Sequence, residues 1–139
     1  MPISYAVNDY PARDDLVGLY ESVEWIAYTK DPERLTRAVA ASLTVATARD
    51  EAGALVGLAR VVGDGLTIAY LQDVLVRPDH QRKGIARELC RLAFEPSADV
   101  RQKVLMTDDE PEQRAFYESI GFTEVRDLPF PIRVFARFE

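Results

Sequence analysis

The chain has 139 residues, of which 47% are hydrophobic and 29% are charged. This composition is that of an ordinary globular protein and excludes a disordered or fibrous chain. The formal net charge at pH 7 is −6, which disfavours a general binder of nucleic acid or of an anionic membrane, because both ligands select basic surfaces. The length predicts one domain spanning residues 1–139.

Cysteine content and hydropathy favour a cytoplasmic protein. Cys90 is the single cysteine, so no intramolecular disulfide can form and a reducing compartment is allowed. The longest stretch without Asp, Glu, Lys or Arg, residues 38–48, is shorter than the ~20 residues that a membrane helix needs. The first residues lack the basic segment and apolar run of a signal peptide. We therefore expect a cytoplasmic location and no membrane partner.

In chain order, the N-terminal half predicts a strand, two helices and a hairpin. Alternation predicts a strand over 3–7, and apolar residues at i, i+3, i+4 and i+7 predict a helix over 15–23. Asp31 and Pro32 suit the N-cap and first position of a second helix. The apolar, β-branched segments 43–49 and 55–62 flank the polar turn 50–53 and predict a hairpin.

The C-terminal half predicts a third antiparallel strand over 66–76, a helix over 85–93 and a short strand over 104–106 that is buried on both faces. Pro111 opens a further helix, which Gly121 closes as a left-handed cap. Alternating apolar residues predict a last strand over 132–138. The order β-α-α-β-β-β-α-β-α-β indicates an α+β (mixed α/β) domain whose mixed sheet has a parallel part.

The segment between the third strand and its helix carries the most specific motif. Gln81-x-x-Gly84-x-Ala86 lies where the helix begins. The first amides of a helix have no partner inside it, and the helix dipole adds partial positive charge there. Gly84 has no Cβ, so a phosphate can approach the backbone closely. Arg82, Lys83 and Arg87 add positive charge, and the segment therefore predicts an anion cradle.

This segment resembles the acetyl-CoA motif of the GNAT acetyltransferase superfamily, which reads Gln/Arg-x-x-Gly-x-Gly/Ala after such a strand. The segment 114–122, Arg-Ala-Phe-Tyr-Glu-Ser-Ile-Gly-Phe, is similar to the second signature of that family. The order of elements is also similar over nearly the whole chain. The resemblance implies a three-layer fold with a mixed, mostly antiparallel sheet of six to seven strands flanked by four helices.

The resemblance also implies acetyl-CoA as co-substrate, with no metal. The backbone of Val74, Leu75 and Val76 would pair with the pantetheine arm like an added strand. The amides of residues 82–87 would hold the pyrophosphate, and the Tyr117 hydroxyl would protonate the departing thiolate. The implied cofactor-binding residues are Val74, Leu75, Val76, Arg82, Lys83, Gly84, Ile85, Ala86, Arg87, Phe116 and Tyr117.

One departure from the family pattern concerns the helix that carries Tyr117. The family often has Asn six residues and Ala three residues before its Phe, whereas this chain has Glu110 and Gln113 at those positions. The departure puts in doubt a polar contact to CoA that the Asn would supply.

The candidate acceptor residues are Trp25, Tyr28, Gln72 and Asp73. A carboxylate is unusual in an apolar strand, so Asp73 is a candidate catalytic base or amine anchor; the alternative is an edge or bulge residue bonded to nearby backbone. Trp25 and Tyr28 lie between the first two helices, where the family builds its acceptor site. An aromatic pair there could hold a cation or an apolar amine, or it could serve packing alone.

Together these features predict an acetyl-CoA-dependent N-acetyltransferase that acts directly on a primary amine of a small molecule. Transfer needs an acid for the leaving thiolate, and a tyrosine is protonated at neutral pH. The alternatives are a protein or peptide N-acetyltransferase and a non-catalytic acyl-CoA sensor or interaction module. The exposed aromatic residues of the last strand also predict a homodimer, because a partner copy would cover them.

Overall fold

The computed structural model describes residues 2–139. They form two compact units, one ending at Met106 and one comprising Thr107–Glu139. The first unit contains all the strands of the described residues and four of the α-helices. No helix in residues 2–139 is both long and apolar enough to cross a membrane.

The sheet follows the order of the chain. Its strands are β1 (Ser4–Val7), β2 (Thr44–Arg49), β3 (Leu55–Gly63), β4 (Ile68–Val76) and β5 (Gln102–Leu105), and they are arranged as β1-β2-β3-β4-β5. The first three pairings are antiparallel, and β4 pairs with β5 in parallel. The predicted hairpin and the predicted parallel part of the sheet are therefore confirmed.

The α-helices are α1 (Arg13–Ser22), α2 (Ile26–Thr29), α3 (Pro32–Ala40), α4 (Ile85–Phe94) and α5 (Pro111–Ser119). Short 3-10 turns follow β4 (η1, Pro78–His80), α4 (η2, Glu95–Ser97) and α5 (η3, Val125–Asp127). The predicted start of α3 is confirmed, because the Asp31 carboxylate accepts a hydrogen bond of 3.1 Å from the Arg34 amide. This cap satisfies one of the amides that a helix start leaves unpaired.

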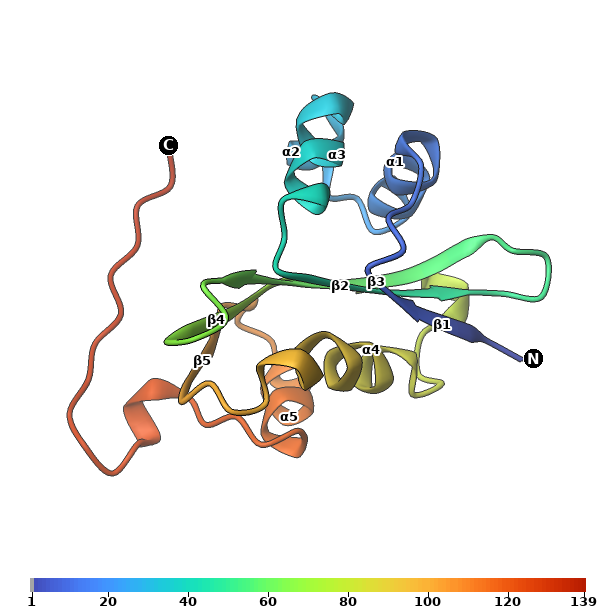
Figure 1. Cartoon of the computed structure of the whole chain (residues 1–139). Coiled ribbons are helices and arrows are strands. Elements are labelled where there is room, and N and C mark those ends of the chain that lie inside the picture. The colour runs from blue at the N-terminus through green and yellow to red at the C-terminus, as the bar shows by residue number, and fades with distance from the viewer. Residues whose placement is uncertain (1) are drawn as a thin grey trace. The chain divides into compact units, whose positions relative to one another are not determined.

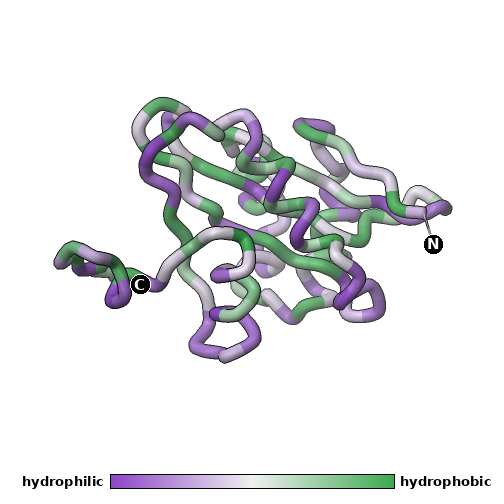
Figure 2. The backbone as a smooth tube through the Cα atoms, turned by 90° about the horizontal axis from the view of Figure 1, so that it is seen from below, coloured by the Kyte–Doolittle hydropathy of each residue, from purple (hydrophilic) through white to green (hydrophobic). Residues whose placement is uncertain are grey.

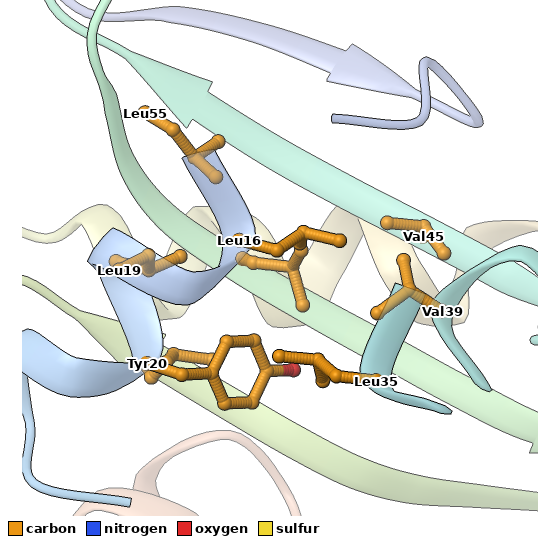
Figure 3. Packing of buried hydrophobic residues seen from close by; sticks show 9 residues of the cluster. Leu16, Leu19, Tyr20, Leu35, Val39, Val45 and Leu55 are labelled. Atoms are coloured by element: carbon orange, nitrogen blue, oxygen red, sulfur yellow. The ribbon is translucent and has the colours of Figure 1, made fainter. Parts of the chain in front are cut away.

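In the first unit the sheet lies between two helical layers. Figure 1 shows α1, α2 and α3 on one face of the sheet and α4 on the other. Hydrophobic stretches run along the strands, while the connecting loops are mostly hydrophilic (Figure 2). On the first face, buried residues of α1, α3 and the central strands form one cluster (Figure 3): Leu16, Leu19, Tyr20, Leu35, Val39, Val45, Leu55, Leu58 and Leu75.

Two sequence-based expectations about strands are wrong. Residues 132–138 are not a strand, so the sheet of the described residues has five strands rather than six to seven. The alternating pattern is present, but a strand also needs a hydrogen-bonded neighbour, and this segment has none among the described residues. The short strand after α4 spans Gln102–Leu105, and it is exposed to half-buried rather than buried on both faces, because it lies at the end of the sheet.

The core cluster predicts a large cost for removing a leucine from α1. We expect Leu16→Ala to lower the free energy of unfolding by about 2–5 kcal/mol, because the side chain is fully buried and its loss leaves a cavity. Leu66→Ala is the matched control: Leu66 is exposed in the loop before β4, so its change should stay within about 0.5 kcal/mol. Urea unfolding of both variants measures the difference, and equal midpoints would contradict the assigned core.

Candidate functional site

The C-terminal half of β4 has one unpaired side. The register between β3 and β4 shifts at Arg60/Val61, where Arg60 lies opposite Asp73 and Val61 lies opposite Leu71. Gln72 is therefore an extra residue in β4, as in a β-bulge. On its other side, β4 pairs with β5 only over Ile68–Leu71. From Gln72 to Val76, no strand of the described residues pairs with that side.

Backbone groups of this unpaired segment point outward at alternate residues. The Arg77 amide donates to the Val56 carbonyl of β3 over 2.8 Å, so the polar groups of Arg77 and Leu75 face β3. Because successive residues of a strand direct their backbone polar groups to opposite sides, those of Val74 and Val76 face the open side. The Gln81 side chain donates to the Val76 carbonyl over 2.9 Å. The open edge thus offers the backbone polar groups of Val74 and the Val76 amide.

The segment after β4, residues 81–87, is called the cradle below, and it has the open helix start on which the predicted anion site depends. After η1, Arg82 and Gly84 have positive φ values of 64° and 81°, and α4 begins at Ile85. The first hydrogen bond of α4 runs from the Glu88 amide to the Gly84 carbonyl over 3.2 Å. The amides of Ile85 and Ala86 therefore have no acceptor inside the helix.

The space beside Gly84 is open. A Cβ atom built on Gly84 would meet no atom within 4 Å, so a phosphate group can approach this backbone directly. Arg82, Lys83 and Arg87 are exposed around it. The cradle and the open edge of β4 are consecutive in the chain, and together they fit a long ligand that carries amide groups and an anionic end.

Asp73 is the centre of a buried hydrogen-bond network. Its Oδ2 accepts from the Arg60 Nε over 2.6 Å and from the Tyr20 hydroxyl over 2.9 Å. Its Oδ1 accepts from the Tyr28 hydroxyl over 2.8 Å. Asp73 and Arg60 are only 3% and 5% exposed, so the pair is held away from water. Both carboxylate oxygens are occupied, and the guanidinium balances the negative charge.

The network reaches the surface at Tyr28. The exposed Gln72 side chain donates to the Tyr28 hydroxyl oxygen over 3.1 Å, and the Arg60 guanidinium lies 6.0 Å from the centre of the Tyr28 ring. Burial is the largest cause of the raised pKa of Tyr28; the hydrogen bond from Gln72 opposes it, and the Asp73 carboxylate adds to it. The phenol therefore stays protonated at neutral pH, and it can donate and accept hydrogen bonds without serving as a base.

The other buried members of the network are also shifted by their surroundings. Burial raises the pKa of Tyr20 well above its usual value, and the Asp73 carboxylate raises it further. Burial is the largest single influence on Arg60 and opposes its charge, but the Asp73 carboxylate, Tyr20 and Tyr28 together outweigh it and raise the pKa of the guanidinium. The Nη1 group of Arg60 donates a hydrogen bond to Ser42 Oγ over 3.3 Å. Arg60 is thus charged at neutral pH.

Sequence reasoning missed Arg60, Tyr20 and Ser42 as members of this site. Arg60 is a charge within the apolar strand 55–62, which is the same signal that marked Asp73. Two opposite charges in two adjacent apolar strands favour a buried ion pair, because a lone buried charge is costly. The structure also changes the expected contacts of Asp73: it lies beside a bulge, but its partners are side chains rather than backbone groups.

Aromatic rings adjoin this network. Tyr20 lies with its ring centre 5.9 Å from that of Trp25 and 5.2 Å from that of Tyr28, and the Trp25 and Tyr28 rings are 6.2 Å apart. Trp25 and Tyr28 are half-buried. The structure therefore brings together all four sequence-predicted acceptor residues, Trp25, Tyr28, Gln72 and Asp73, through direct contacts or through Tyr20.

Phe116 and Tyr117 belong to the second unit. The spacing of Phe116 and Ile120 in the sequence predicts that they form the buried face of α5, but these two are half-buried, and Tyr117 is the buried residue of this helix. The Tyr117 ring lies 5.0 Å from Phe116 and 6.3 Å from Phe122. The predicted cap is confirmed: Gly121 has a φ of 100°, and the Phe122 amide donates to the Tyr117 carbonyl over 3.0 Å.

Comparison with known proteins identifies the fold and the family. The profile of the family described as "Acetyltransferase (GNAT) domain" matches residues 41–124, a span that includes the open edge, the cradle and α5. A GNAT-family acetyltransferase of Streptococcus pneumoniae has a structure with a TM-score of 0.84 to this one. The two are 30% identical, and the match covers 99% of this chain and 100% of the other.

Two further matches are weaker: one covers only about half of this chain, and the other has a lower sequence identity. A Gibberella zeae protein named as an acetyltransferase is 32% identical over 76 residues, which are 52% of this chain and 42% of that protein. This chain therefore spans less than half of that curated relative. An aminoglycoside N-acetyltransferase in complex with CoA has a TM-score of 0.69 at 17% identity, over 99% of this chain and 95% of the other. With a family profile that covers more than half of its residues, the chain belongs to the GNAT acetyltransferase family.

Proposed function

We propose that the protein is an acetyl-CoA-dependent N-acetyltransferase that transfers the acetyl group directly to a primary amine of a small molecule. The observation that supports this most is the continuity of two features: the unpaired side of β4 leads directly into the open first turn of α4. A strand edge binds an extended chain that carries amides, and a helix start binds a phosphate. CoA has both parts in that order.

The residues present fit this co-substrate. The backbone polar groups of Val74 and the Val76 amide would pair with the pantetheine arm, with Leu75 holding the strand to β3. The amides of residues 82–87 would hold the pyrophosphate at Gly84, and Arg82, Lys83 and Arg87 would add positive charge. When bound, acetyl-CoA supplies an activated acetyl thioester.

Tyr117 is the proposed acid. A thiolate leaving group needs a proton donor, and a phenol with an ordinary pKa of about 10 is protonated at neutral pH. Phe116, its neighbour in the second GNAT signature, would contact the co-substrate. Glu110 and Gln113 stand where the family often has Asn and Ala, so we assign no CoA contact to either.

On the acceptor side, we propose that Trp25, Tyr28 and Gln72 contact the amine. The sequence indicates Asp73 as a candidate base or amine anchor, but its carboxylate is buried, neutralised by Arg60 and bonded through both oxygens. We therefore propose Asp73 as a positioning residue that acts through Tyr28. The ring faces of Trp25 and Tyr28 suit a cationic or apolar amine.

Two observations support a small-molecule acceptor: the negative net charge of the chain, and the acceptor of another protein with this fold. The net charge of −6 attracts a cationic amine at a distance. The fold is shared with an aminoglycoside N-acetyltransferase, so it can accommodate an acceptor of that size. The test is release of CoA from acetyl-CoA by the full chain, with a panel of polyamines, aminoglycosides, arylalkylamines and short peptides, and with mass spectrometry of the products.

Each result of this panel has a definite meaning. Acetylation of a non-peptide amine supports the proposal. Acetylation of peptides alone would replace it with a peptide N-acetyltransferase. Tight binding of acetyl-CoA with no product from any acceptor would favour a non-catalytic acyl-CoA sensor.

The cradle predicts a selective loss of CoA binding in Gly84→Val. A side chain there fills the space that a phosphate would use, and at a φ of 81° it adds about 1–2 kcal/mol of backbone strain. Gly53→Val is a matched control, because Gly53 has a φ of 85° and also no atom within 4 Å of an added Cβ. We expect similar losses of stability in both variants, but a loss of CoA affinity of at least about tenfold in Gly84→Val alone. Isothermal calorimetry that gave equal affinities would contradict the cradle.

The acid role predicts a loss of turnover in Tyr117→Phe. The substitution keeps the ring and removes the proton donor, so kcat should fall about 10²–10⁴-fold while the affinity for acetyl-CoA changes little. Tyr10→Phe, at an exposed tyrosine, controls for loss of a hydroxyl elsewhere. A purely structural Tyr117 would instead give lower stability and nearly normal turnover under conditions where chemistry limits the rate.

The positioning role of Asp73 predicts non-additive kinetics. Tyr28→Phe should raise the KM for the amine about tenfold, since a hydrogen bond to a charged group contributes about 1.5–3 kcal/mol. Asp73→Asn should act in the same direction, but it should add little in the Tyr28→Phe background, because both changes disturb one contact. Additive losses of kcat/KM in the double variant would show that Asp73 contacts the amine independently.

A further inference from the structure

The residues of β3 point alternately toward the two helical layers. Leu58 belongs to the buried cluster that includes residues of α1 and α3 (Figure 3). A Cβ atom built on Gly57 would instead meet the Leu89 side chain of α4 at 2.9 Å. Because successive side chains of a strand point to opposite faces, Arg60 and Val62 share the face of Leu58. This is the face that α1, α2 and α3 cover (Figure 1).

The bulge in β4 brings Tyr70 to the same face. Asp73 lies opposite Arg60 on β3. Tyr70 lies opposite Val62, and residues directly opposite one another in an antiparallel pair have their side chains on one face. In a strand without the extra residue Gln72, positions 70 and 73 would point to opposite faces. The bulge therefore places Tyr70 and Asp73 on one side of the sheet.

The Tyr70 side chain is half-buried and has no partner of its own. Burial is the largest cause of its raised pKa, and the Asp73 carboxylate adds to it, in agreement with their shared face. Within residues 2–139, the Tyr70 side chain makes neither a hydrogen bond nor a ring contact. Its ring is therefore available to a ligand on this side of the sheet.

The sheet surface around Tyr70 is apolar and carries no net charge. Val62, which lies opposite Tyr70, is also half-buried. The charged strand residues of this region are Arg60 and Asp73, and they neutralise each other across 2.6 Å. A polycation would find no free carboxylate on this part of the sheet, whereas a flat apolar group would bury surface against the ring and the valine.

Hydrogen-bond directions show where an amino group can bind beside this surface. Asp73 is a carboxylate paired with Arg60, so it only accepts, and the single hydroxyl proton of Tyr28 is donated to it. The Tyr28 oxygen therefore accepts from the Gln72 amide nitrogen, and the Gln72 amide oxygen is directed away from it. That oxygen, on an exposed side chain, and the second lone pair of the Tyr28 hydroxyl can both accept N–H groups.

The distance along the sheet suits a small amine. One step of two residues on β3 separates Arg60 from Val62, which is about 7 Å. The Tyr70–Val62 pair therefore lies about 7 Å from the ion pair, and the hydrogen bonds join Tyr28 and Gln72 to the ion-pair end of that step. Phenethylamine has roughly this length.

We propose that Tyr70 is a specificity-determining residue of the acceptor site, and that the acceptor is a monoamine with a flat apolar body. The amino group binds the Gln72 oxygen and the Tyr28 hydroxyl, and the body lies against Tyr70 and Val62. This role rests on the proposed acetyl transfer. It adds a direction to it: the co-substrate lies along residues 74–76 of β4, and the acceptor extends along residues 70–72.

The experiment compares phenethylamine with ethylamine, which has the amino group but no ring. Tyr70→Ala should lower kcat/KM for phenethylamine about three- to tenfold, the size of an aromatic contact, and should leave that for ethylamine unchanged. Tyr70→Phe keeps the ring and should stay near the wild type with both amines. Tyr5→Ala is the matched control. Tyr5 is a half-buried strand tyrosine whose pKa is raised by burial and then by Glu88 of α4, so it lies on the other face of the sheet.

Binding is also measured without turnover. In the full wild-type chain with ring-labelled tyrosines, the Tyr70 resonance is assigned by its loss in Tyr70→Phe. Added phenethylamine should shift this resonance, because an aromatic ring placed against it changes its local magnetic field, and should leave the Tyr5 resonance in place. Circular dichroism checks that each variant is folded.

The two readouts separate this role from the proposed function. No acetylated product from any amine would overturn the N-acetyltransferase function, and the Tyr70 resonance would still show whether an apolar amine binds there. A resonance that stays fixed with phenethylamine would overturn the role of Tyr70. Equal losses with both amines in a folded Tyr70→Ala, or a preference for the polycation spermidine that this variant leaves intact, would overturn it as well. If Tyr70→Ala does not fold, the wild-type resonance decides.

Discussion

The buried ion pair between Asp73 and Arg60 is the interaction on which the arrangement of α1, α2, β3 and β4 around Tyr28 depends. It joins β3 to β4, and its tyrosine partners tie α1 and α2 to the same carboxylate. Removing one partner of such a pair typically costs about 3–5 kcal/mol, because the other is left charged and buried. No buried side-chain nitrogen or oxygen of the described residues lacks a hydrogen bond. Besides its effect on stability, the pair holds Tyr28 by a hydrogen bond to Asp73, and Tyr28 in turn accepts a hydrogen bond from Gln72.

The opening in the sheet follows from the way β4 pairs on its two sides. On one side it pairs with β3 from Ala69 to Val76, with one extra residue at Gln72. On the other side its parallel partner ends after Leu71, and the chain from Val76 turns into the cradle and α4. The bulge thus lies at the point where the pairing with β5 ends. One strand consequently carries the buried carboxylate, the exposed Gln72 and the open backbone edge.

Much of the fold and part of the candidate site could be predicted from the sequence, because they depend on short sequence patterns. The hairpin, the cap at Asp31, the glycine at the start of α4 and the cap at Gly121 each depend on a few consecutive residues. The network around Asp73 could not, since its partners come from positions 13, 45 and 53 residues away in the chain. The wrong prediction of a strand over 132–138 has another cause. Alternation indicates that a segment can form a strand, but it does not show whether a neighbouring strand is present to form the hydrogen bonds.

The strictly sequential order of the sheet also bears on how the chain folds. β2, β3 and β4 are joined by the short loops 50–54 and 64–67, so closing these pairings costs little chain entropy. Pairing β1 with β2 requires closure across residues 8–43, and the parallel pairing of β5 requires the crossover through α4. Local pairings generally form faster than distant ones. Among the strand pairings, those of the meander over 44–76 therefore need the least loop closure, and this segment contains both charges of the buried pair, Arg60 and Asp73.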